Sequence, residues 1–208
     1  MYINENLNKN EHYSSSMEDL LNLCFEKNEL TNAEYIISLM KELPASSRGY
    51  HGSYKGGLYD HTLLVSNICE TLFSTFIDYN IIQIFKKEID KEINVKNAIK
   101  ACILHDFGKV DSYTEKFNQN FEFSSIEKDR KRTRFYIQKD YKVFGKDDHV
   151  ERCFCVMKKA EIYAVPVVQE AIIFHHGGWS GFKSRRVTNP LCSLIHSCDL
   201  IASGFYKI

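Results

Sequence analysis

The feature that most constrains this chain is the segment Ala101–Val110, which reads ACILHDFGKV. Mostly apolar residues lead directly into His105 and Asp106, so two polar side chains end an apolar helical pattern. Burial of such groups costs several kcal/mol unless a partner satisfies them. A divalent metal ion would do so, because imidazole nitrogen and carboxylate oxygen both bind such ions. A structural His–Asp hydrogen bond is the alternative, and this segment alone does not decide between the two.

The residues that follow this pair are predicted to shape the same site. Gly108 would let the chain leave the helix, since glycine takes left-handed backbone dihedrals freely. Lys109 would place a cation beside the metal ion, where an anionic substrate could be held.

Composition narrows the class of protein. The chain has 208 residues, 44% of them hydrophobic, which suits one globular domain with a real core. Its 27 basic and 27 acidic residues cancel, which argues against coating nucleic acid by bulk charge. Zero net charge does not exclude binding of a small nucleotide, or of a single nucleic-acid strand in a local groove. Seven cysteines without a CxxC pair favour free thiols and a cytoplasmic location. The polar N-terminus is not that of a signal peptide, and no apolar run approaches the roughly 20 residues of a membrane span, so no membrane partner is expected.

Hydrophobic periodicity predicts a mainly α fold. Residues 1–14 are expected to be loose, and residues 15–208 to form one domain. Asn94 is the predicted N-cap of a helix from Val95 to His105, and Pro166 and Pro190 are expected in the first turns of later helices. In residues 112–142, partial alternation of Phe, Tyr and Ile predicts a small β-hairpin insertion.

The loop of residues 45–57 contains four glycines together with Arg48, His51 and Lys55. Exposed backbone N–H groups and cations in such a loop suit phosphate oxygens. A plain turn-rich connector is the alternative, and it would be preferred if the loop stood alone.

Further ligand-type side chains fall on predicted helices. His61 shares an apolar stripe with Leu58 and Leu64, so it points inward and can meet His105 on the neighbouring helix. A lone inward histidine is more often a core residue than a ligand. Because His105 also points inward on the neighbouring helix, the ligand interpretation is favoured for His61. The other candidates lie at or beside apolar helical segments, at His149, His175, His176 and Asp199. His196 precedes Asp199 by three residues on a shared face.

The order of these residues resembles the HD-domain superfamily of metal-dependent phosphohydrolases. Gly56–Val65, reading GGLYDHTLLV, and Leu104–Val110, reading LHDFGKV, look like the signature of a bacterial and phage subgroup related to HD 3′→5′ exonucleases. The stretches PASSR and HGSY before the first block, and FHHGG after His149, resemble the same subgroup. The resemblance covers roughly residues 43–202 and implies a single HD-domain helical bundle.

The resemblance also implies a ligand set. His61, His105, Asp106 and Asp199 would bind a first metal ion. His149 and His175 would serve a second ion bridged through Asp106, and His176 is an alternative or additional ligand. The cofactor would be one or two divalent transition metal ions, namely Mn, Fe, Co, Ni or Zn, because the mixed N/O ligand set suits them better than Mg²⁺.

The activity implied is metal-dependent hydrolysis of a phosphate ester in a nucleotide, with a small or cyclic (oligo)nucleotide favoured. Asp106 would orient the nucleophile, Lys109 would stabilise developing charge, and His176 or His51 would protonate the leaving oxygen. The residues expected to bind substrate are Arg48, His51, Lys55 and Lys109. A dNTPase or 5′-nucleotidase, a role on single-stranded nucleic-acid ends, and a non-catalytic metal-stabilised nucleotide-binding module all stay open. A homodimer is expected by analogy alone.

Overall fold

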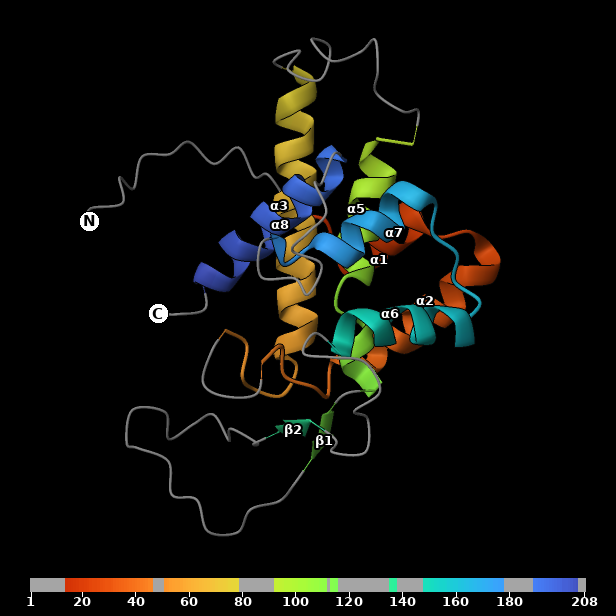
Figure 1. Ribbon diagram of the computed structural model, residues 1–208, viewed down its shortest axis with the longest axis vertical. Coiled ribbons are helices and arrows are strands. Elements are labelled where there is room, and N and C mark those ends of the chain that lie inside the picture. The colour runs from red at the N-terminus through yellow and green to blue at the C-terminus, as the bar shows by residue number, and fades with distance from the viewer. Residues whose placement is uncertain are drawn as a thin grey trace, which may run out of the picture.

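The computed structural model describes residues 14–46, 51–78, 92–111, 113–115, 135–137, 148–177 and 189–205. These residues are mainly helical, which confirms the predicted fold class (Figure 1). The elements are α1 (Met17–Cys24), α2 (Lys27–Met40), α3 (Gly57–Asp78), α5 (Val95–Leu104), the 3₁₀ helix η1 (Phe107–Asp111), α6 (Asp148–Lys159), α7 (Pro166–Phe174) and α8 (Pro190–Phe205).

Local sequence signals explain where several helices begin. The side chain of Asn94 accepts a hydrogen bond from the Asn97 backbone N–H, so it caps α5 as predicted. Pro166 and Pro190 are the first residues of α7 and α8, where the missing N–H of proline removes no helical hydrogen bond.

Helix α5 lies at the centre of the core. Every residue from Ala98 to Leu104 is buried, because α5 packs against α1, α3, α7 and α8. Six of these seven residues are apolar, and Lys100 forms an ion pair with Glu29, so this part of α5 is buried on all sides. Its C-terminal end therefore delivers His105 and Asp106 into the interior, where both are buried.

Helices α3 and α8 pack against each other, and α8 also packs against α7 (Figure 1). Helix α6 packs against η1, directly after the end of α5. Through these contacts the carboxyl ends of α5 and α7 and the faces of α3, α6 and α8 surround one buried region.

Two short strands, β1 (Tyr113–Glu115) and β2 (Phe135–Ile137), pair antiparallel with Tyr113 opposite Ile137. The residues between these strands lie outside the described part of the chain, so the hairpin insertion around 112–142 stays a prediction. Of the segment 1–14, which is expected to be loose, only residue 14 belongs to the described part of the chain. The division of the chain at residue 15 therefore also stays a prediction. Within the described ranges, none of the helices combines the length and apolarity of a membrane span.

Candidate metal centre

Five helices bring seven ligand-type side chains into one buried region. They are His61 from α3, His105 and Asp106 from the end of α5, His149 from α6, His175 and His176 from the end of α7, and Asp199 from α8. Neighbouring rings are close, with centroid separations of 5.6 Å between His61 and His105 and 5.0 Å between His105 and His175. Residues more than 100 positions apart in the sequence thus form a continuous cluster.

His105 and His175 occupy equivalent positions at the C-caps of α5 and α7. The Nδ1 of each ring hydrogen-bonds a carbonyl three residues earlier, that of Cys102 or of Ile172. Because a carbonyl can only accept, Nδ1 carries the hydrogen in both rings, and Nε2 is the atom that offers a lone pair whenever the ring is neutral. Both Nε2 atoms are buried, and neither has a hydrogen-bond partner within the part of the chain that the structure describes. This is the orientation and tautomer that a histidine needs to bind a metal ion through Nε2.

The Asp106 carboxylate lies between two groups of histidines. Its Oδ2 is 3.4 Å from Nε2 of His105 and 3.8 Å from Nε2 of His61, while its Oδ1 is 3.8 Å from Nε2 of His149. Oδ1 is buried and has no hydrogen-bond partner among the described residues, which is costly for a carboxylate. Lys109 Nζ donates to Oδ2 over 2.7 Å. Burial acts to raise the pKa of Asp106, but Lys109 and His105 outweigh it and hold the pKa well below its usual range.

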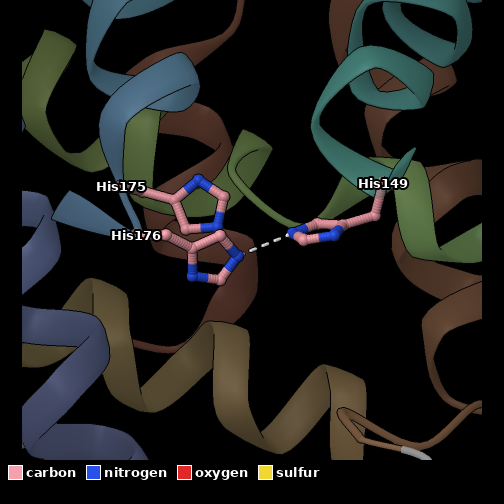
Figure 2. Close-up of side chains that lie close together, drawn as sticks. All are labelled: His149, His175 and His176. Carbon is pink, nitrogen blue, oxygen red and sulfur yellow. Dashed lines mark hydrogen bonds between the residues drawn. The ribbon is translucent and has the colours of Figure 1, made fainter. Parts of the chain in front are cut away.

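His149, His175 and His176 form the second group (Figure 2). Figure 2 shows the rings of His149 and His176 facing each other from opposite sides, with their Nε2 atoms 2.9 Å apart. Burial lowers the pKa of all three rings, and for His149 burial and the nearby Lys109 lower the pKa to about 3. The rings are therefore neutral at pH 7, as metal ligands must be. Two neutral imidazole nitrogens this close need either a shared proton or a shared cation.

His61, His105 and Asp106 form the first group, whose ligand atoms lie within 4.8 Å of one another, as do those of the second. Asp199 adds a carboxylate beside it, since its Oδ1 is 3.0 Å from Nε2 of His61. Burial acts to raise the pKa of Asp199, but His61 and His105 outweigh it and lower the pKa below its usual range. The donor sets are imidazole nitrogen and carboxylate oxygen, and they fit divalent transition metals. Each group could hold one such ion.

Gly108 has a different role from the one predicted. The left-handed glycines in the described ranges are Gly52, Gly56 and Gly177, and Gly108 is not among them. The chain leaves α5 through His105 in the right-handed helical region and continues directly into η1. A Cβ on Gly108 would lie 1.8 Å from the backbone oxygen of His149. Gly108 is therefore needed for the close approach of α6, which brings His149 to Asp106.

Of the predicted substrate-binding residues, His51 and Lys109 lie at the cluster, whereas Lys55 does not. His51 lies against the cluster, with its ring centroid 4.8 Å from that of His61, and burial together with His61 lowers the pKa of His51 to about 4. Lys109 also donates to the Ala45 carbonyl over 2.8 Å. Lys55 is more than half exposed and forms an ion pair with Glu42, so the structure places it at the surface rather than in the buried cluster. Arg48 lies outside the described residues.

One further residue contacts the cluster without having been given a role by sequence reasoning. His196 lies on α8, and its Nδ1 is 2.8 Å from the carbonyl oxygen of His175. The sequence signal that could have identified His196 is its spacing from Asp199, since residues three apart share a helix face. That spacing does not reveal a contact with the end of α7.

Comparison with protein families gives a match over most of the predicted domain. A family model described as HD domain matches residues 58–202, a range that includes all seven side chains of the cluster. No curated protein and no solved structure matches the chain significantly. Because the family model covers well over half of the 208 residues, the chain belongs to the HD-domain family, whose members are typically metal-dependent hydrolases.

Proposed function

We propose that this protein hydrolyses a phosphate ester of a nucleotide, with a small or cyclic (oligo)nucleotide as the favoured substrate. The observation that carries the proposal is the placement of Asp106 between two groups of histidines, with each carboxylate oxygen directed at a different group. A carboxylate so placed can bridge two metal ions, and paired ions suit phosphate-ester hydrolysis because they clamp both the attacking and the leaving oxygen.

The proposed ligands follow the two groups. The first ion would be held by His61, His105, Asp106 and Asp199, and the second by His149, His175, His176 and the other oxygen of Asp106. The geometry supports His176 as a ligand in addition to His175, because its Nε2 faces that of His149. When bound, such ions act as Lewis acids and lower the pKa of a coordinated water toward 7.

Lys109 is proposed to hold phosphate oxygens and to stabilise developing negative charge. Its ammonium group already lies in the centre, within hydrogen-bond distance of Asp106 and of the Ala45 carbonyl. Its positive charge beside the Asp106 carboxylate suits it to attract an anionic phosphate oxygen to this centre. Ala45 comes three residues before Arg48, which we propose as the second cation for the phosphate.

His51 is the proposed donor of a proton to the leaving oxygen. It lies beside His61 but belongs to neither group of ligands, whereas His176 is directed toward His149. Burial lowers the pKa of His51 to about 4, and the negative charge of a bound phosphate would raise it toward the neutral range, where a proton donor is effective. His176 is the second candidate for this step.

The test combines metal content with turnover. Purified protein is analysed by ICP-MS and assayed with bis-(p-nitrophenyl) phosphate in Mn²⁺, Ni²⁺ and Co²⁺. We expect two ions per chain and diester cleavage. Asp106→Asn keeps the volume of the side chain but removes its charge, so it should lose metal and lose activity by at least roughly 100-fold. Ser197→Ala is the control, because Ser197 is exposed on the same helix as Asp199 and its hydroxyl donates to the Ser193 carbonyl one turn earlier in that helix.

The outcomes separate the functions that remain. Diester cleavage would justify a screen of cyclic nucleotides and single-stranded ends, while one ion without diester cleavage points to a 5′-nucleotidase or dNTPase. The products then distinguish these: inorganic phosphate from a monophosphate and triphosphate from a dNTP. Nucleotide binding without turnover in Mn²⁺ would favour a binding module, and a fully active Asp106→Asn variant would contradict the proposal.

A cytoplasmic location and a homodimer belong to the same proposal. Light scattering of the purified protein tests the homodimer.

A further inference from the structure

His196 joins helix α8 to the turn that follows α7. Its Nδ1 lies 2.8 Å from the His175 carbonyl oxygen, so Nδ1 carries the hydrogen and donates it. His175 binds in turn to the last turn of α7 through its own Nδ1. The backbone and the ring of His175 are therefore each held by a separate hydrogen bond.

The ring of His196 also packs against Gly177, the residue that ends this turn. Gly177 has a φ of +54°, a conformation that glycine adopts without strain. A Cβ on Gly177 would lie 2.8 Å from Nε2 of His196 and 3.0 Å from two of its ring carbons. The imidazole thus occupies the space that the missing side chain leaves, and it contacts the turn at both of its ends.

The same helix carries Asp199, one turn after His196. Asp199 contacts His61 in the first group of ligands, while His196 contacts the turn that bears two members of the second. Helix α8 therefore contacts both groups, the first directly at His61 and the second through the backbone of His175.

We propose that His196 is a positioning residue for the second metal ion: it holds the turn His175–Gly177 so that the rings of His175 and His176 face His149. This inference rests on the proposed function. It predicts that loss of the hydrogen bond weakens the second ion selectively. Loss of an outer partner of a metal ligand typically costs about 10-fold to 100-fold in affinity, and we expect about 10-fold because His196 acts through the backbone.

The test uses two substitutions in the full-length chain. His196→Phe keeps a ring against Gly177 but removes the donor, whereas His196→Asn keeps an N–H donor and loses the ring. Co²⁺ is titrated into metal-free protein, and visible absorption together with chelator competition gives the affinity of each site. Ser197→Ala is the matched control on the next residue. Thermal unfolding of each metal-free variant checks that the fold is retained.

We expect wild-type protein and Ser197→Ala to bind two Co²⁺ ions alike. His196→Phe should bind the first ion normally and the second about 10-fold more weakly, and His196→Asn should recover much of this loss. Unchanged binding of both ions by His196→Phe would overturn this inference and leave the proposed function standing, as would an equal weakening of both ions. Absence of metal binding by the wild-type protein would overturn both.

Discussion

Replacement of Gly108 by alanine tests whether the close approach of α6 to η1 builds the metal centre. The added Cβ would lie 1.8 Å from the His149 backbone oxygen and 2.7 Å from the Cys153 nitrogen. Both are main-chain atoms of α6, so no flexible side chain can rotate away to make room. The helix itself has to move, and it carries His149.

The size of the effect follows from these distances. An ordinary contact at this position starts at 3.4 Å, so the two backbones must separate by about 1.6 Å. Overpacking of a core typically costs about 1–3 kcal/mol, and we expect a value near the upper end because backbone must shift. For a chain of this length, 1 kcal/mol corresponds to roughly 2–4 °C, so Tm should fall by roughly 6–12 °C. Since Nε2 of His149 is only 3.8 Å from Asp106, the same shift should weaken binding of the second metal ion.

The assay is thermal unfolding of metal-free protein, followed by metal analysis of the folded variant. Gly204→Ala is the control, because it makes the same chemical change on α8 at a position where a Cβ would meet no atom of the described residues within 4 Å. Alanine is a better helix former than glycine, so this variant should gain up to about 1 kcal/mol. A Gly108→Ala variant with the Tm and metal content of the wild-type protein would refute the reasoning.

Two further predictions concern stability. The pKa of His149 is about 3 because of burial and Lys109, so between pH 6.5 and 3 the unfolded chain takes up a proton that the folded chain does not. The contribution of His149 to the stability of metal-free protein should be fully present above about pH 6.5 and should fall with decreasing pH, by up to about 1.4 kcal/mol per pH unit, as measured by urea unfolding in EDTA. His105 acts in the opposite direction, because Asp106 raises its pKa against the effect of burial. An unfolding midpoint that does not change between pH 7 and 5 would contradict the prediction. Lys100 and Glu29 form a nearly buried ion pair of 2.8 Å, and Glu29 also accepts a hydrogen bond from the Tyr163 backbone N–H. Lys100→Met should therefore cost about 3–5 kcal/mol, because the buried carboxylate loses its countercharge, and Glu29→Gln added to it should restore much of the loss. Equal stability of the single and double variants in urea would argue against this account.

The helical class and several helix boundaries were accessible from sequence because they depend on local rules. The cap at Asn94 and the starts at Pro166 and Pro190 involve only neighbouring backbone groups, and the structure confirms them. The exit from α5 was predicted wrongly, since glycine at position 108 was interpreted through its own dihedrals. Its real constraint is a backbone 41 residues further along the chain, which no local pattern contains.

The sequence by itself determined that ligand-type side chains lie at the ends or on the inner faces of apolar helices, because helical periodicity places a residue on a face without reference to the rest of the fold. Only the tertiary structure decided how they group: Asp106 between two sets of histidines, His176 facing His149, and Lys55 at the surface beside Glu42. Only the tertiary structure, too, placed His196 against the turn after α7. The physical reason is that these distances depend on how whole helices pack, and packing is set by side-chain volumes and close backbone approaches summed over residues that are remote in sequence.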